Sequence, residues 1–532
     1  MNTETLRKKI LDLAIRGKLV PQDPNDEPAS VLLERIRTQK AQMVKDGKLK
    51  AKDVKNDTII YVGEDNLHYE KFADGTIKCI EDEIPFEVPE GWAWAHLSDI
   101  AQILNGDRGQ NYPAKNKLQD TGIPFVSASN IESGVVISNN LLCMTEAQYK
   151  SLGAGKLITN DIVYCIRGSL GKCGFFTMSK GAISSSLVIV RPFRENNVIR
   201  KYLFLYLNAS LAESEIKKYD NGSAQPNLAA KDFARFLIPV PPLDELDTIV
   251  KKTDNVLMLV EQITNNKESI KNIISLTTSK ILDLAIRGKL VPQNENDEPA
   301  SVLLERIRAE KEELIKQRKI KRDKRESVIY RGADNSYYER FADGSEKCID
   351  EEIPFEIPGS WLFVRLKEIG SIIGGGTPRT SNESYWDGNI YWITPADLSN
   401  HSDIYISHGS RSITELGLKD SSATLMPAHT VLYSSRAPIG HIAIAANALA
   451  TNQGFKSVVP HDTRMSLFVY FCLKERTPSI VLRATGTTFK EISGTAMAET
   501  IVPLPPLREQ KRICNKIRSL FTLLENMHQI ID

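Results

Sequence analysis

The chain has 532 residues, of which 41% are hydrophobic and 25% charged, and its formal net charge is +1. This composition is typical of a globular protein with two to four domains. No stretch approaches the ~20 consecutive apolar residues of a membrane span, and the polar start MNTETLRKKI is unlike a signal peptide, so we expect a cytoplasmic protein without a membrane segment. Seven scattered cysteines without a C-x-x-C pair argue against a zinc knuckle or a disulfide framework.

The first predicted element is a helix over about Thr3 to Arg16, and it opens a long internal repeat. The segment ILDLAIRGKLVPQ at Ile10 to Gln22 returns unchanged at Ile281 to Gln293. DEPASVLLERIR at Asp26 to Arg37 likewise returns at Asp297 to Arg308. The chain is therefore a tandem duplication.

A retained module follows in each copy, from Val31 to Gly91 and from Val302 to Ser360. Each module begins as a charged helix and continues into a predicted hairpin and an acidic, proline-bounded stretch that ends near a tryptophan. The second charged helix carries a basic run from Arg308 to Glu326. A solvated helix face explains such a run, and contact with DNA or a partner subunit is the alternative.

After Trp92 and Trp361 the copies diverge into two unlike domains, over residues 92–242 and 361–504. Strands alternate with polar turns in both, and three blocks still align. In one block a predicted apolar strand leads to an arginine, Arg167 or Arg436, in a glycine-closed turn. Arginine is well suited to bind guanine or a phosphate.

Polar side chains in the loops of these domains could read base edges or hold a DNA backbone, although each alone could be an ordinary turn residue. The candidate DNA-binding residues are Arg108, Gln110, Arg167, Lys172, Gln225, Asn227, Thr377, Arg379, Arg436, Asn452, Gln453 and Thr487. From Trp92 to Val240 there are 16 Lys and Arg against 11 Asp and Glu, but from Trp361 to Pro505 only 12 against 11. If this chain binds DNA, we expect partner subunits to supply part of the positive charge.

Between the two copies, apolar residues recur at steps of three and four and predict one helix from about Asp244 to Arg287. A second helix with the same start, Pro-Pro-Leu, follows Leu504 and continues to the end of the chain. The organisation is then residues 1–91, 92–242, 243–360, 361–504 and 505–532: a module, a variable domain, the central helix with the second module, a second variable domain, and a terminal helix.

The C-terminal and N-terminal helices together match the length of the central helix. We expect them to lie end to end and to pack antiparallel on it, as a pseudo-twofold, circular arrangement of an α+β protein with two mixed α/β domains. Ordinary helix packing inside a domain is the alternative. The helix residues expected to dock partner subunits are Ile249, Val256, Val260, Ile263, Ile517, Leu520 and Leu524.

Catalytic motifs are missing from the sequence. There is no G-x-x-x-x-G-K-[ST] loop, neither Pro-Pro pair stands in an adenine-methyltransferase motif, and the eight histidines form no H-E-x-x-H or H-x-x-x-H pair. The run Gly374 to Gly376 could approach a phosphate, but alone it is a weak signal. We therefore expect neither a catalytic residue nor a metal site in this chain.

The duplicated frame resembles the specificity subunit of type I restriction-modification enzymes. The resemblance covers nearly the whole chain and rests on the two PPL-x-E helix starts, the ILDLAIRGKLVPQ element, and the GGTP and TNQGF segments at Gly375 and Thr451. One departure is Leu246, which stands where the second copy has Gln510; this puts the first helix start or a partner contact in question.

The resemblance implies two target recognition domains that each read one half of a bipartite DNA site in the major groove. The helices would set the spacer and hold two methyltransferase subunits, and two restriction subunits would complete the enzyme. S-adenosylmethionine, ATP and Mg²⁺ would be bound by those partners. A tandem enzyme, a modification-only system and a protein-binding coiled-coil scaffold remain the alternatives.

Overall fold

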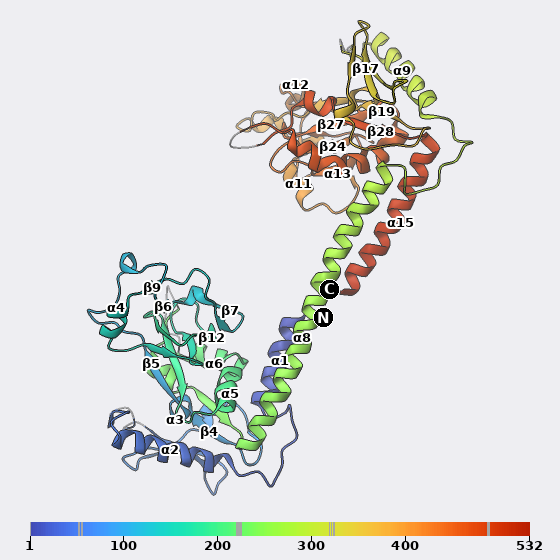
Figure 1. Cartoon of the computed structure of the whole chain (residues 1–532). Helices are drawn as coiled ribbons and strands as arrows, with labels where there is room; N and C mark the ends of the chain where they lie inside the picture. The colour runs from blue at the N-terminus through green and yellow to red at the C-terminus, as the bar shows by residue number, and fades with distance from the viewer. Residues whose placement is uncertain are drawn as a thin grey trace. The chain divides into compact units, whose positions relative to one another are not determined.

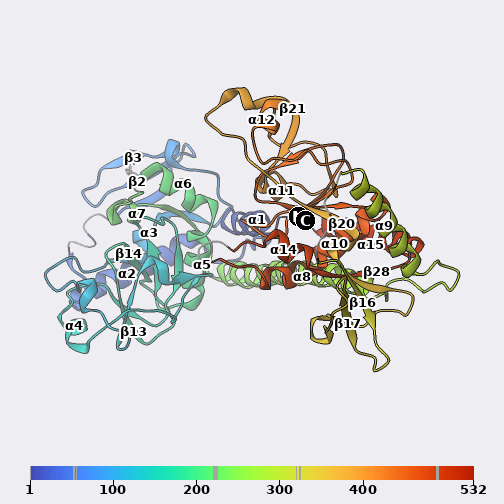
Figure 2. The same ribbon diagram turned by 90° about the horizontal axis from the view of Figure 1, so that it is seen from above.

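The chain is described from a computed structural model, in which residues 2–51, 54, 57–219, 226–318, 320, 322, 325–486 and 490–531 are placed (Figures 1 and 2). Its internal contacts divide it into two compact units, Met1–Lys267 (unit 1) and Glu268–Asp532 (unit 2). Helices and strands both build each unit, which confirms the predicted mixed α/β class. Among the placed residues, no helix is both long and apolar enough to span a bilayer.

Unit 1 starts with the repeated frame. Its placed helices are α1 (Thr3–Ile15), α2 (Ala29–Lys45), α3 (Leu97–Ile100), α4 (Glu146–Ser151), α5 (Asn197–Leu207), α6 (Ser210–Tyr219), α7 (Ala230–Ala234) and the first part of α8 (Leu243–Ile286). The module sheet is β1 (Ile59–Val62), β2 (His68–Lys71) and β3 (Ile77–Cys79) in that order, so the predicted hairpin gains a third strand.

The first variable domain contains three sheets. A six-stranded sheet runs in the order β5 (Ala101–Asn105), β14 (Leu187–Pro192), β11 (Ile162–Cys165), β12 (Cys173–Phe175), β8 (Val135–Val136) and β7 (Ile131–Glu132). A four-stranded sheet has the order β10 (Lys156–Ile158), β13 (Lys180–Ile183), β6 (Ile123–Val126) and β9 (Cys143–Met144). The pair β4 (Ala93–His96) and β15 (Leu237–Val240) closes the domain. All four β11 side chains are buried, because other elements cover both faces of this central strand.

Unit 2 repeats this plan. Its placed helices after α8 are α9 (Ala300–Lys316), α10 (Leu366–Ile369), α11 (Pro395–Ser399), α12 (Glu415–Lys419), α13 (Ser466–Leu482), α14 (Gly494–Ala498) and α15 (Leu507–Ile531). The module sheet is β16 (Ser327–Arg331), β17 (Tyr337–Phe341) and β18 (Glu346–Cys348), and the closing pair is β19 (Leu362–Arg365) with β28 (Ile501–Leu504).

The second variable domain has two further sheets. One has the order β20 (Gly370–Gly374), β27 (Lys456–Pro460), β24 (Val431–Tyr433), β25 (Ile442–Ala445) and β22 (Tyr405–Ile406). The other has the order β23 (Arg411–Ile413), β21 (Trp386–Ile393) and β26 (Ala450–Thr451). In both units, therefore, a long, mainly antiparallel sheet with one parallel strand pair follows the closing pair, and it carries the strand that leads to Arg167 or Arg436.

The predicted central helix is confirmed, since α8 runs from Leu243 to Ile286. In unit 1 it lies beside α1 (Figure 1), and the two helices share one hydrophobic core. In unit 2 its last turns share a core with α15. The end-to-end contact of α1 with α15 would join the two units, and it stays a prediction. The difference between Leu246 in α8 and Gln510 in α15 leaves the helix start intact, because each side chain is buried at the equivalent position in the first turn of its helix.

Both copies of the repeated motif end a helix in the same way. Gly17 follows α1 and Gly288 follows α8, each with a positive φ, of 65° and 67°. A side chain at either position would collide with a module proline, Pro89 or Pro358. The helix end therefore needs glycine for its backbone conformation and for its packing, which accounts for this part of the repeat.

The glutamate of each PPL-x-E start ties a helix to its domain. The indole N–H of Trp92 donates to Glu245 Oε2 at 2.9 Å, and that of Trp361 donates to Glu509 Oε2 at 3.0 Å. Gln22, the last residue of the motif, donates to the other oxygen of Glu245. Burial raises the pKa of Glu245, although these two hydrogen bonds favour its ionised form.

A buried basic side chain joins each module to its variable domain. In unit 1, His96 Nε2 lies 2.9 Å from Glu70 Oε1, and its Nδ1 lies 2.8 Å from the carbonyl oxygen of Arg235. In unit 2, Arg365 donates to Glu339 Oε2 at 2.6 Å and to the carbonyl oxygen of Glu499 at 2.8 Å. The two joints thus use equivalent acceptors with different basic side chains.

Candidate nucleic-acid interface

A polar hollow of about 440 Å³ opens on unit 1 where the end of β5, the β11–β12 loop and the start of α7 meet. Three predicted residues, which come from three separate segments, line it together. They are accompanied by two residues that the sequence reasoning missed. The polar lining is Asn105, Arg108, Arg167, Asn227 and Lys231. Since none of the placed residues that line this hollow is acidic, its wall is cationic.

The frame around Arg167 is a set of backbone hydrogen bonds. The buried strand β11 leads into Ile166, whose N–H donates to the carbonyl oxygen of Ser186 at 2.9 Å. The carbonyl oxygen of Ile166 accepts from the N–H of Leu228 at 2.9 Å. The next side chain, Arg167, then donates from Nε to Asn227 Oδ1 at 2.9 Å. The guanidinium is therefore oriented at the mouth of the hollow by a neutral amide.

The loop that carries Arg108 is held by one carboxylate. Asp107 accepts from the backbone N–H groups of Gly109 and Gly153, each at 2.7 Å. These hydrogen bonds lower the pKa of Asp107, so its side chain stays ionised. Arg108 itself reaches the carbonyl oxygen of Ser185 at 3.4 Å. Its exposed side chain is thus supported without being neutralised by a carboxylate in these contacts.

The other predicted residues of unit 1 do not line this hollow. Gln110 is exposed on the Arg108 loop, and Lys172 is exposed at the far end of the β11–β12 loop. Gln225 lies outside the placed residues.

Unit 2 has a larger hollow, of about 1000 Å³, which overlaps the equivalent place in part and extends to the module residues Lys311 and Arg325. It again includes the end of the strand that follows the closing pair and the first residues of a short helix, here Gly374 and Gly494. Five basic side chains and one glutamate, Glu499, contribute to its wall. The basic side chains are Lys311, Arg325, Lys367, Lys456 and His461. Burial, together with the charge of Lys311, lowers the pKa of His461 to about 4, so this imidazole is neutral near pH 7.

Arg436 occupies the position of Arg167. The N–H of Ser435 donates to the carbonyl oxygen of Gly454 at 2.7 Å, and its carbonyl oxygen accepts from Ile492 at 3.0 Å. This pattern repeats that of Ile166. Arg436 Nη1 then lies 3.8 Å from Glu491 Oε2, while Lys456 Nζ lies 3.2 Å from Glu491 Oε1.

Two predicted residues of unit 2 meet in one contact. The Thr377 hydroxyl donates to Gln453 Oε1. Nearby, the Gly376 N–H donates to the carbonyl oxygen of Thr451 at 2.9 Å, and an added Cβ at Gly375 or Gly376 would collide with neighbouring backbone. The glycine run therefore serves close chain packing. Asn452 closes a turn by accepting from the Gly454 N–H at 2.9 Å.

Arg379 lies apart from that contact, on the exposed loop before β21. Its carbonyl oxygen accepts from the indole N–H of Trp386 at 3.4 Å. Arg411, which the sequence reasoning missed, stacks on the same indole with its guanidinium carbon 3.5 Å from the ring centre. Thr487 lies outside the placed residues.

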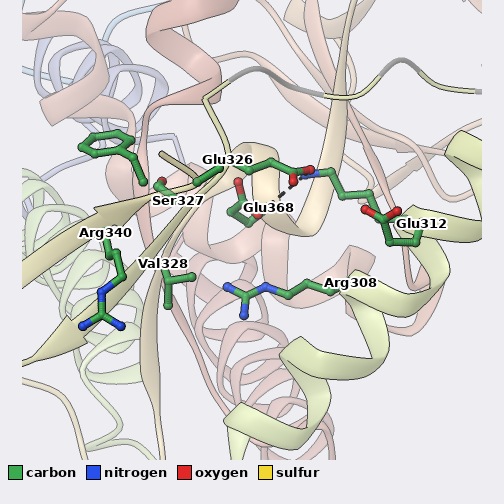
Figure 3. Close-up of a pocket in the computed structure, with 10 residues that line it drawn as sticks. Arg308, Glu312, Glu326, Ser327, Val328, Arg340 and Glu368 are labelled. Carbon is green, nitrogen blue, oxygen red and sulfur yellow. Dashed lines mark ion pairs between the residues drawn. The ribbon is translucent and has the colours of Figure 1, made fainter. Parts of the chain in front are cut away.

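Three basic side chains of the run in the second module, Lys311, Lys316 and Arg322, form ion pairs within the chain. Lys311 is buried and forms ion pairs with Glu326 at 3.1 Å and Glu368 at 3.6 Å (Figure 3). Arg322 pairs with Glu312 at 2.5 Å. Arg308 extends into a neighbouring hollow of about 300 Å³ (Figure 3). These pairs lower the positive charge that this helix can present to DNA.

Most of the expected docking residues on the helices face the chain itself. Ile249 and Ile517 are fully buried in the two cores, Val260 is buried, and Val256, Leu520 and Leu524 are half-buried. Ile263 alone in this set is exposed, at 38%. Burial within the chain argues against partner contact by Ile249, Val260 and Ile517, and the docking role of the other four residues stays a prediction. The exposed apolar side chains of these helices are Met258, Leu259, Ile263, Ile273, Leu276, Leu523, Met527 and Ile530.

Among the placed residues, no cluster of His, Cys, Asp and Glu side chains has the arrangement of a metal site.

Residues 89–272 and 358–532 match the family described as "Type I restriction modification DNA specificity domain". The chain belongs to this family. Each matched region begins next to the tryptophan that opens a variable domain and extends into a long helix, so each match includes a variable domain and residues of the helix that follows it.

Two relatives carry the name of specificity subunits. The type I restriction enzyme MjaIX specificity subunit of Methanocaldococcus jannaschii is 43% identical over 173 residues, which are 32% of this chain and 40% of that subunit. The EcoAI specificity subunit of Escherichia coli is 27% identical over 595 residues, with 99% of this chain and 90% of that subunit covered. The second alignment also covers the repeated modules, which lie largely outside the residues that match the family.

A solved structure has the same fold. It is titled "Structural basis underlying complex assembly and conformational transition of the type I R-M system", and its matching chain aligns with a TM-score of 0.51 at 18% identity. The alignment covers 84% of this chain and 94% of that one. The sequence-based resemblance to type I specificity subunits is thereby confirmed by family, relatives and fold.

Proposed function

We propose that this chain is the sequence-reading subunit of a type I restriction-modification complex. Each DNA specificity domain binds one half of a bipartite, asymmetric site in double-stranded DNA. The observation that carries this proposal is the pair of hollows. Each includes the end of the strand that follows the closing pair, Asn105 or Gly374, and the start of a short helix, Ala230 or Gly494, and the two differ in the side chains that they present. Beside them, Arg167 and Arg436 follow the same backbone hydrogen bonds, at Ile166 and Ser435.

The chemistry of both hollows suits nucleic acid. Arginine and lysine contact phosphates or guanine, and asparagine and glutamine pair with adenine in the major groove. Arg108, Arg167 and Lys231 supply the cations in unit 1, and Asn105 and Asn227 supply the amides. Differing side chains on a common frame would let the two domains prefer different base sequences.

The helices would set the spacer between the two half-sites. A helix of 44 residues such as α8 spans about 65 Å at 1.5 Å per residue. B-DNA repeats every ~34 Å, so a rigid support of this length could bridge more than one turn. In this proposal α1 and α15 pack antiparallel on α8 as a coiled coil with pseudo-twofold symmetry.

The catalytic steps would belong to partners. Two methyltransferase subunits would dock on the helices and bind S-adenosylmethionine, and two restriction subunits would use ATP and Mg²⁺. The exposed apolar side chains of α8 and α15 support this docking, because a helix in water gains by covering such groups. This chain would contribute DNA recognition and assembly, and no catalytic group.

The proposal is tested by DNA binding of the purified complex. With Arg167→Ala, we expect binding to weaken by about 1–3 kcal/mol, or specificity to relax, at one half-site only, because Arg167 faces a single hollow. The measurement is competition binding with DNA duplexes in which either half-site is scrambled. Arg35→Ala on α2, which removes an exposed arginine paired with Glu27, is the matched control.

Equal loss at both half-sites would contradict separate readers. A complex with no DNA affinity would support a protein-binding scaffold instead.

A further inference from the structure

Glu491 is a carboxylate beside the unit 2 hollow, which it reaches through Lys456, one of the residues that line the hollow. Its neighbours are two cations, Arg436 at 3.8 Å and Lys456 at 3.2 Å. The glutamate side chain is 39% exposed and that of Arg436 is 36% exposed, whereas that of Lys456 is 17% exposed. The carboxylate of Glu491 is therefore accessible to solvent, while the less exposed Lys456 holds its orientation.

Unit 1 has no such carboxylate at this place. The equivalent of Glu491 is Asn227, because each precedes the residue whose N–H bonds to the strand end, Leu228 or Ile492. The equivalent of Lys456 is Val188, two residues after Ser186 as Lys456 is after Gly454, and Val188 is buried. Unit 2 thus has both a carboxylate and a lysine at positions where unit 1 has neither, although the backbone hydrogen bonds are the same in both units.

An accessible carboxylate is unfavourable against a phosphate backbone, since like charges repel at short distance. It becomes favourable where DNA presents a hydrogen-bond donor. In the major groove those donors are exocyclic amino groups, the N4 amino group of cytosine and the N6 amino group of adenine. A carboxylate can only accept hydrogen bonds, so it would disfavour guanine O6 and thymine O4 at the same position.

We propose that Glu491 is a specificity-determining residue of unit 2 that accepts a hydrogen bond from an exocyclic amino group of one base in its half-site. Arg436 and Lys456 position the carboxylate. Asn227, which has both a donor and an acceptor, takes the equivalent place in unit 1 and selects differently. This inference rests on the proposed function, because it needs DNA bound at the surface that carries Arg436 and Glu491.

Glu491→Gln tests the inference, since it keeps the shape of the side chain and one acceptor but removes the charge. The experiment measures competition binding of the purified complex to duplexes that carry every single base-pair change of the recognised site. We expect discrimination at one base pair of one half-site to fall by about 5- to 150-fold, with the other half-site unchanged.

A second readout is the salt dependence of affinity for nonspecific DNA. Removing the carboxylate releases Arg436 and Lys456 for phosphates, so the slope of log affinity against log salt should steepen by about 1. Asn227→Asp should change the opposite half-site only. Glu313→Gln is the matched control, because it removes the same charge from the outer face of α9, where Glu313 pairs with Lys316.

Unchanged base preferences in Glu491→Gln would overturn the inference, even with a steeper salt slope, because the glutamate would then only neutralise its neighbours. Equal weakening of both half-sites would also overturn it, as damage to the fold. If the unsubstituted complex shows no base preference at all, the proposed function fails, and this inference fails with it.

Discussion

His96 and Arg365 hold equivalent joints, and the comparison indicates the charge of His96. Both ring nitrogens of His96 face acceptors, a carboxylate and a carbonyl oxygen, so both must carry a proton to satisfy the geometry. Arg365, which is permanently charged, donates to the two equivalent acceptors in unit 2. Burial lowers the pKa of His96, but its hydrogen bond to Glu70 and the charge of Asp99 outweigh burial and raise the pKa above 6.5.

The joint of unit 1 should therefore depend on pH. A raised pKa in the folded state means that protonated His96 stabilises the fold fully below about pH 6.5, and that this stabilisation is lost as pH rises through the raised value. His96→Arg should remove this loss. The measurement is urea unfolding of the purified chain, with and without the substitution, from pH 6 to pH 9.

Arg365→His is the reciprocal variant, and it should give unit 2 the same loss above neutral pH. The other charged groups near His96 in unit 1, Asp99, Glu215 and Arg235, are unchanged in His96→Arg. An identical pH dependence for the original chain and His96→Arg would show that His96 is neutral in the fold.

Sequence reasoning at the residue scale found the arginines and missed their neighbours. Arg167 and Arg436 stood out because an apolar strand and a closing glycine fix their place in both copies. Asn105 and Lys231 carry no such signal, since they reach the hollow only when β5 and α7 come together in three dimensions. Glu491 was visible in the aligned block opposite Asn227, but only the fold shows that it meets Lys456.

At the scale of elements, α8 could be predicted because heptad spacing sustained over 44 residues is typical of a single long helix. Which of its apolar side chains are buried and which are exposed could not be predicted. Val260 is buried while Ile263, three residues later, is 38% exposed, because one apolar row meets different neighbours along its length. The third module strand, β3, was also missed, since its three exposed residues bury no alternating face.

An insertion in α8 tests whether this helix sets the spacer. Adding about one helical turn, four residues, near Lys267 should lengthen the spacer that the complex tolerates and leave both half-sites unchanged. The measurement is binding of the complex to duplexes that differ only in spacer length. A changed half-site with an unchanged spacer would show that the length of α8 does not set the spacer.

The exposed face of α8 offers a separate test of partner docking. Leu276 is 71% exposed, so Leu276→Asp should spare the fold but weaken assembly with the methyltransferase subunits, because it places a charge in an apolar contact. Co-purification of the subunits measures this. Asn272→Asp, at an exposed polar position one turn away, is the control. Full assembly of Leu276→Asp would place the docking surface elsewhere.

For the whole molecule, duplication explains what is shared and what differs. The repeated letters are those that build contacts within each unit, such as Gly17 against Pro89 and Gln22 with Glu245, and their equivalents in unit 2. The variable domains that follow each tryptophan keep the backbone hydrogen bonds at Ile166 and Ser435, and they differ in the side chains that line their hollows. A chain that keeps its frame and varies its recognition surfaces is consistent with one reader of two different half-sites.

The central claim is that this chain selects the DNA sequence for its complex. The most direct measurement is a genome-wide map of adenine methylation in the host with and without the gene for this chain. We predict that deletion removes methylation at one asymmetric motif made of two half-sites separated by a fixed gap, and that the Arg167→Ala gene alters one half of that motif. Unchanged methylation after deletion, in a host where the complex is expressed and assembled, would contradict the claim.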